Sequence, residues 1–180
     1  DGFRFDLMGI HDVDTMNAVV AAGRKLKPEL MVYGEGWDLP TALNDDLKAC
    51  QRNNAKMPQV AHFNDYFRDV VKGKTSDFDV QAKGYATGNL YQAHDMPSAL
   101  CANTLNKEMY KIYQQPSQSI NYVECHDNAT SWDKMKDCCK DEVREIRVKR
   151  QKLMIAVTLV AQGVPFLQSG QEFCRTKYGY

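Results

Sequence analysis

Two acidic side chains lie at short apolar runs and could form a catalytic pair. Asp6 lies near the end of the run 2–7, and period-two alternation places Arg4 on the same side, where its charge would keep Asp6 ionised. Glu35 follows another apolar run and lies between two glycines, just before Trp37, where loss of water would favour its protonated form. One charged and one protonated carboxyl, roughly 5 to 5.5 Å apart, is the pair that retaining glycoside hydrolysis needs.

These residues therefore predict Asp6 as the nucleophile and Glu35 as the acid. Taken alone, a structural ion pair explains Arg4 and Asp6 nearly as well, and a solvated turn would explain Glu35. A third polar cluster, with His126 and Asp127, follows the apolar run 120–125. Such a cluster directly after a strand is typical of a site at the carboxyl ends of parallel strands.

Five apolar runs of strand length predict the elements that position these groups. They are residues 2–7, 30–33, 59–63, 120–125 and 164–167. A helix capped by Asp14 and ended by Pro28 is expected between the first two, and a long helix over 141–162, solvated in its first half and buried in its second. Helical crossovers between strands predict parallel pairing and an α/β fold. Residues 72–98 are expected to form either an irregular insertion that lines a site or a disordered surface loop.

The composition excludes several partners. The 180 residues carry 23 basic and 23 acidic side chains, so the formal net charge is zero, which argues against nucleic acid or an anionic membrane as a partner. No apolar run reaches the roughly 20 residues of a membrane span. The six cysteines form no zinc motif, which favours reduced thiols and a cytoplasmic location, with a secreted parent protein as the alternative. The adjacent Cys138 and Cys139 could be redox-active.

Three motifs in this order resemble the α-amylase family of glycoside hydrolases. They are residues 2–9 (GFRFDLMG), 33–38 (YGEGWD) and 122–128 (YVECHDN). Within that family the chain resembles the type I pullulanases more closely, through residues 6–11 (DLMGIH), 63–65 (FND) with Arg68 and Asp69, and 168–173 (QSGQEF) with 175–177 (RTK). The resemblance covers nearly the whole chain.

The resemblance implies a (β/α)8 TIM barrel that hydrolyses α-1,6 branch linkages in pullulan, limit dextrin or glycogen. In such enzymes the residue matching Asp6 forms the glycosyl-enzyme, and the one matching Glu35 is the acid and then the base. The residue matching Asp127 binds sugar hydroxyls, supported by those matching Arg4 and His126. Trp37 is expected to bind substrate through its flat indole face.

Only part of such a barrel is expected here, because five strands can be counted and they correspond to barrel strands four to eight. Residues 1–180 would then be the C-terminal portion of the catalytic domain, separated from the N-terminal half of the barrel. Such an open half-barrel is expected to be marginally stable, dimeric or prone to aggregation, and inactive. No cofactor or metal is predicted, and no calcium-binding spacing of acidic residues supports that ion.

Two alternatives stay open. The first is another enzyme of the same family, an isoamylase, a glycogen debranching enzyme or an α-1,4 amylase, because these share the catalytic groups. The second is a non-catalytic glucan-binding protein that keeps the barrel residues for folding.

Overall fold

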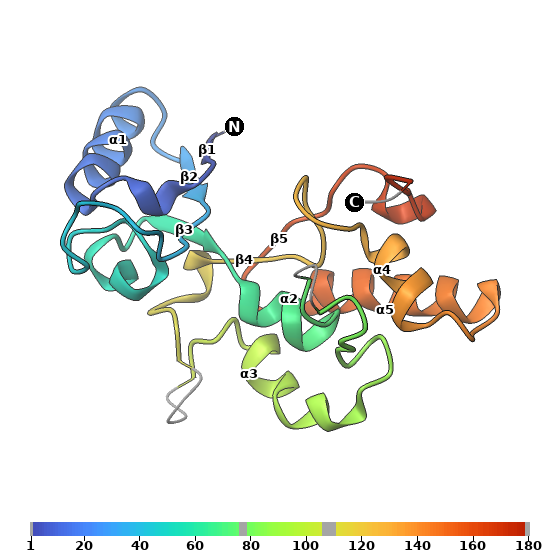
Figure 1. Cartoon of the computed structure of the whole chain (residues 1–180). Coiled ribbons are helices and arrows are strands. Elements are labelled where there is room, and N and C mark those ends of the chain that lie inside the picture. Colours follow the sequence, from blue (N-terminus) through green and yellow to red (C-terminus); the bar gives the residue numbers. More distant parts are fainter. Residues whose placement is uncertain (1, 76–78, 106–110, 179–180) are drawn as a thin grey trace. The chain divides into compact units, whose positions relative to one another are not determined.

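The structure is a computed structural model that describes residues 2–75, 79–105 and 111–178. It is an α/β structure whose five-stranded sheet has the order β1-β2-β3-β4-β5. The chain divides into two compact units (Figure 1), and each has its own hydrophobic core. Unit 1 comprises residues 1–63 and 102–120, and unit 2 comprises residues 64–101 and 121–180.

Unit 1 carries the first three strands. Its elements are β1 (Gly2–Phe5), η1 (Met8–Ile10), α1 (Val13–Leu26), β2 (Met31–Gly34), η2 (Gln51–Lys56), β3 (Val60–Phe63), η5 (Pro116–Gln118) and the start of β4 (Ser119–Asn121). The pairs β1·β2, β2·β3 and β3·β4 are all parallel. The sequence-based prediction of parallel strands in chain order is confirmed for these pairs.

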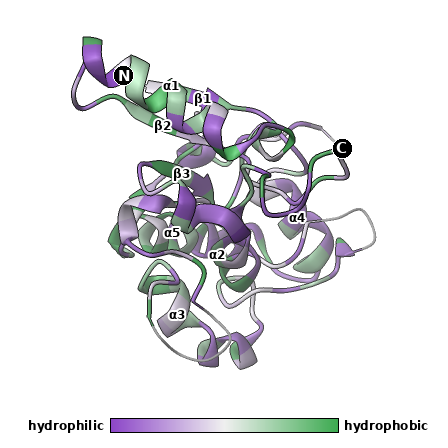
Figure 2. Ribbon diagram, turned by 90° about the vertical axis from the view of Figure 1, so that its left-hand side faces the viewer, coloured by the Kyte–Doolittle hydropathy of each residue, from purple (hydrophilic) through white to green (hydrophobic). Residues whose placement is uncertain are grey.

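Helix α1 packs on the sheet of unit 1 through one face. Its buried residues Val13, Met16 and Val20 join the core that includes Val32 of β2, and Figure 2 shows hydrophilic and hydrophobic residues mixed along the helix. The predicted cap at Asp14 is wrong: Asp12 is the cap, because its carboxylate accepts hydrogen bonds from the amide and hydroxyl of Thr15. Leu26 is exposed at the end of the helix.

Unit 2 contains the remaining elements. They are α2 (Asp65–Val71), η4 (Leu90–His94), α3 (Met96–Leu100), α4 (Ser131–Cys138), α5 (Arg144–Val160), β5 (Val164–Pro165) and η6 (Gln171–Phe173). The long helix is shorter at both ends than the predicted 141–162. The expected division into a solvated first half and a buried second half is confirmed in outline: the buried residues Gln151, Met154 and Val157 all lie in the second half, on one stripe, while Leu153 and Val160 there are exposed.

All five predicted strands exist, but the fourth is much shorter than expected. β4 ends at Asn121, whose carbonyl accepts from the amide of Phe166 and whose side chain donates to the carbonyl of Gln162. Residues 122–125 lie outside the strand, and Glu124 there accepts the Ser131 amide. Buried polar groups thus end the strand early, although the run itself is apolar enough to continue.

The segment predicted as irregular, residues 72–98, is partly regular. It contains η4 and the first residues of α3, and the amides of Tyr85 and Ala86 donate to the carbonyls of Val70 and Val71 at the end of α2. Residues 76–78 of this segment lie outside the described residues. Among the helices that the structure describes, none combines the length and apolar character of a membrane span.

Candidate active site

Parallel pairing of β1 and β2 brings the two predicted catalytic carboxylates together in unit 1. Phe5 pairs with Gly34 at the end of both strands, and the amide of Glu35 donates to the carbonyl of Phe5 (3.0 Å). Asp6 and Glu35 are the next residues of the two strands. A carboxylate oxygen of Asp6 lies within 4.8 Å of one of Glu35, a separation compatible with the close pair of retaining glycosidases.

Arg4 bridges both carboxylates. Its guanidinium donates to Asp6 Oδ1 at 2.7 Å and to Glu35 Oε1 at 2.8 Å, and it lies 5.2 Å from the ring centre of Phe63 on β3. The second oxygen of Glu35 accepts the amide of Leu7 (2.9 Å). Leu7 adopts a left-handed conformation (φ 46°) that turns its amide toward this carboxylate. The guanidinium therefore fixes the relative position of the two acids.

The environments of the two acids differ from the prediction in one respect. Glu35 is buried as expected, with a side chain 3% exposed against 55% for Asp6. Arg4 pairs with Asp6 as expected, but it also binds Glu35, a contact that the sequence analysis did not predict. The sequence could not reveal this, since residues 4 and 35 meet only through the register of β1 and β2.

Gly36 allows a close approach between the Glu35 turn and β3. A Cβ added at Gly36 would lie 2.3 Å from Nδ1 of His62 and 3.1 Å from the amide of Gln51. His62 is fully buried and stacks on Tyr113, with ring centres 6.2 Å apart. The imidazole therefore has little room to move, and a side chain at position 36 must displace the turn that carries Glu35.

We expect Gly36→Ala in the full-length protein to lower kcat/KM about 100-fold, because a shift of about 1 Å in a catalytic group has that effect. Steady-state kinetics measures the loss. His62→Ala removes the ring that the new methyl group would meet, so the double variant should be more active than Gly36→Ala alone. An additive loss in the double variant would contradict this contact.

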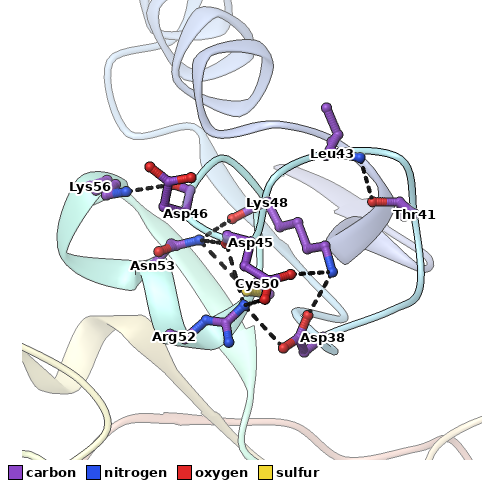
Figure 3. Close-up of polar contacts among 10 residues, drawn as sticks. All are labelled: Asp38, Thr41, Leu43, Asp45, Asp46, Lys48, Cys50, Arg52, Asn53 and Lys56. Carbon is purple, nitrogen blue, oxygen red and sulfur yellow. Dashed lines mark hydrogen bonds and ion pairs between the residues drawn. The ribbon is translucent and has the colours of Figure 1, made fainter.

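A network of charged side chains holds the loop that follows Trp37 (Figure 3). Lys48, almost fully buried, lies 3.1 Å from Asp38 and 2.9 Å from Asp45. Arg52 also pairs with both carboxylates. Trp37 is partly exposed just before this network, and its carbonyl accepts the amide of Leu39. The sequence analysis gave Lys48 no role, since its partners become apparent only in the folded loop.

Unit 2 brings His126 and Asp127 together after β4. Nε2 of His126 lies 3.3 Å from Oδ1 of Asp127, and both side chains are about half exposed, at 52% and 55%. The ammonium of Lys177 donates to the carbonyls of His126 and Asn128, and its own amide donates to Asp133 (2.7 Å). A residue 50 positions downstream thus fixes the loop, which the spacing of the motif could not show.

Buried charged groups lie beneath this loop. Glu124 accepts the Ser131 amide at 2.6 Å, and burial raises the pKa of its carboxyl. Burial also lowers the pKa of Lys72 to about 7. The sequence analysis assigned no role to Lys72. The one available signal is its place at the end of an apolar helix, directly after Val70 and Val71.

Among the residues that the structure describes, one group of side chains outside the carboxylate pair has the spacing of metal ligands. Donor atoms of Cys125, His126 and Asp127 all lie within 4.8 Å of one another. Calcium binds oxygen ligands, whereas this set offers one sulfur, one nitrogen and one carboxylate. These three residues therefore do not fit calcium.

Comparison with curated proteins shows that the chain is homologous to pullulanases along its length. It is 48% identical over 179 residues to a pullulanase of Bacillus subtilis, a match that covers 99% of this chain and 25% of the relative. It is 34% identical over 190 residues to pullulanase A of Streptococcus pneumoniae, covering 98% of this chain and 14% of the relative. No family model matches the chain.

Solved structures give the same result. Pullulanase type I from Bacillus subtilis, complexed with maltose, matches with a TM-score of 0.96 and 47% identity, over 100% of this chain and 25% of that one. Pullulanase from Anoxybacillus sp. LM18-11, complexed with maltotriose, matches with a TM-score of 0.94 and 47% identity, over 100% and 25%. The chain spans about a quarter of the length of these relatives, and its fold is part of a (β/α)8 barrel.

Proposed function

We propose that this chain, a homologue of the type I pullulanases of the α-amylase family, supplies barrel strands four to eight of a retaining glycoside hydrolase. The full-length protein would cleave α-1,6-glucosidic branch linkages in pullulan, limit dextrin or glycogen. One observation carries the proposal: Arg4 holds Asp6 and Glu35 at the ends of paired parallel strands, with carboxylate oxygens within 4.8 Å. Structures of relatives with maltose and maltotriose support an α-glucan as the substrate class.

In the first step, the carboxylate of Asp6 attacks the anomeric carbon while Glu35 protonates the leaving glycosidic oxygen. The exposed side of Asp6 suits contact with a sugar, whereas Glu35 is buried and held by Arg4 and the Leu7 amide. In the second step, Glu35 takes a proton from water, and that water releases the sugar from Asp6. Both steps require the two carboxyl groups to be held in fixed positions. The guanidinium of Arg4, which binds both, holds them there.

His126, Asp127 and Trp37 would bind the sugar. The half-exposed carboxylate of Asp127 can accept hydrogen bonds from sugar hydroxyls, and His126 beside it can donate one. Trp37 offers an apolar ring to the flat face of a glucose unit. The remaining strands of the barrel must come from residues outside this chain, so we expect the isolated 180 residues to be inactive.

Product analysis on pullulan tests the proposal. We expect the full-length protein to release maltotriose, because cutting each α-1,6 linkage of pullulan leaves that trisaccharide. Panose or isopanose would indicate an α-1,4-cleaving member of the family, and absence of any product together with retained glucan binding would indicate a non-catalytic binding protein. Either result would overturn the proposed activity.

A further inference from the structure

Unit 2 contains two adjacent thiols that lie in contact. Cys138 is the last residue of α4 and Cys139 follows it, and their Sγ atoms are 3.7 Å apart. Both belong to the core cluster of unit 2 and are only 5% and 2% exposed. The catalytic proposal gives these thiols no role.

The two thiols are chemically unequal. The hydrogen bond with Cys139 lowers the pKa of Cys138 to about 7, and the positive charges of Lys134 and Lys83 act in the same direction. The pKa of Cys139 is raised, first by the same hydrogen bond and then by burial. Its Sγ also lies 3.4 Å from the carbonyl of Thr87, a second acceptor that competes with the Cys138 sulfur for the single Cys139 proton. Cys138 is therefore the thiol that ionises, and Cys139 is the one that stays protonated beside it.

We propose that Cys138 and Cys139 form a peroxide-reactive dithiol that closes to a vicinal disulfide. The Cys138 thiolate attacks one oxygen of hydrogen peroxide, the O–O bond breaks, and the departing hydroxide takes a proton and leaves as water. Cys138 is then a sulfenic acid. The sulfur of Cys139 attacks it, the S–S bond forms, the S–O bond breaks, and hydroxide leaves with the Cys139 proton as a second water. Overall, two thiols and one peroxide give one disulfide and two waters.

The burial of the two cysteines determines which oxidant can reach Cys138 and which thiol can react with its sulfenic acid. Cysteine residues that are only 5% and 2% exposed admit a small molecule such as hydrogen peroxide more readily than glutathione disulfide or a second protein. The sulfenic acid formed at Cys138 has the Cys139 sulfur as an immediate neighbour, at the present separation of 3.7 Å. Closure within the pair therefore needs no second thiol-bearing molecule.

The first test is peptide mass spectrometry of the full-length protein after mild treatment with hydrogen peroxide. We expect the peptide with residues 138–139 to lose two hydrogens, to resist alkylation, and to regain both thiols in dithiothreitol. The partly exposed Cys101 serves as an internal reference. Both thiols still open to alkylation under conditions that oxidise Cys101, or sulfinic acid in place of the disulfide, would overturn the proposal.

The second test assigns the roles of the two sulfurs. In Cys139→Ser, sulfenic acid should persist at Cys138 and react with dimedone. In Cys138→Ser, oxidation at Cys139 should slow at least tenfold, and no dimedone label should appear there. The matched variant Cys101→Ser should leave the peptide with residues 138–139 unchanged. A dimedone label at Cys139 instead of Cys138 would refute the assignment of Cys138 as the thiol that reacts with peroxide and of Cys139 as the thiol that closes the disulfide. These readouts do not depend on glycosidase activity, so they stand or fall separately from the proposed function.

Discussion

Replacing Asp6 by alanine in the full-length protein is expected to lower kcat on pullulan by about four orders of magnitude or more, while the Kd for glucan stays near the wild-type value. Without the carboxylate no glycosyl-enzyme can form, so the whole benefit of covalent catalysis is lost. The side chain is 55% exposed, and its removal leaves Arg4 paired with Glu35, so the fold should survive. Steady-state kinetics and equilibrium binding of maltotetraose measure the two effects.

Asp14→Ala is the matched control, because Asp14 is an exposed acid in the first turn of α1 and lies outside the carboxylate pair. It should leave kcat unchanged.

Azide gives a sharper test of the role of Asp6. A small anion in the space left by the carboxylate should attack from the same face, partly restore turnover and yield a glycosyl azide of inverted configuration. Unchanged turnover in Asp6→Ala would refute the assignment.

The pairing of Asp6 with Glu35 could be predicted from the sequence because it rests on local rules. Alternation places Arg4 and Asp6 on one side of a strand, and parallel strands end at the same edge. The bridging contact from Arg4 to Glu35 depends on strand register instead. Nothing in the residues around position 35 indicates that a guanidinium from the neighbouring strand will bind there.

Two of the errors in predicted helix and strand bounds share a cause, which is competition from side-chain hydrogen bonds. Asp12 rather than Asp14 caps α1 because its carboxylate reaches the Thr15 amide. The fourth strand ends at Asn121 although the apolar run continues, and the buried Glu124 beyond it binds the backbone of Ser131. Apolar periodicity indicates that an element exists, but its ends are set by such polar contacts.

The contacts of single charged residues could not be predicted, whether they lie within one loop or between distant segments. Lys48 binds two carboxylates of its own loop, and Lys177 binds carbonyls about 50 residues upstream. From the sequence alone, a lysine side chain is as consistent with a solvated position on the surface as with a paired one. The resemblance to a known family identified the residues of the motif, whereas only the fold shows which side chains hold the motif in place.

Acidification below about pH 6.5 is expected to weaken β3 and its neighbours through His62. The ring is fully buried, neither nitrogen has a hydrogen-bond partner among the described residues, and burial lowers its pKa to about 3. In the unfolded chain the pKa is 6.5. Between these values the unfolded state binds one proton more than the folded state, so stability is full above pH 6.5 and falls as the pH drops toward 3. At about 1.4 kcal/mol per pH unit, the loss by pH 4.5 is about 3 kcal/mol.

Hydrogen exchange of the β3 amides, corrected for the intrinsic pH dependence of exchange, measures this loss in the full-length protein. His62→Leu removes the titrating ring and should flatten the pH dependence, even though the substitution changes stability at neutral pH. His94→Leu is the matched control: the side chain of His94 is 85% exposed, so its removal should leave the profile of β3 unchanged. The buried imidazole of His62 is the group that titrates, so the pH profile of β3 exchange should differ from wild type in His62→Leu but not in His94→Leu. If the stability of β3 fell equally steeply with pH in wild type and in His62→Leu, another group would control the acid sensitivity of this strand.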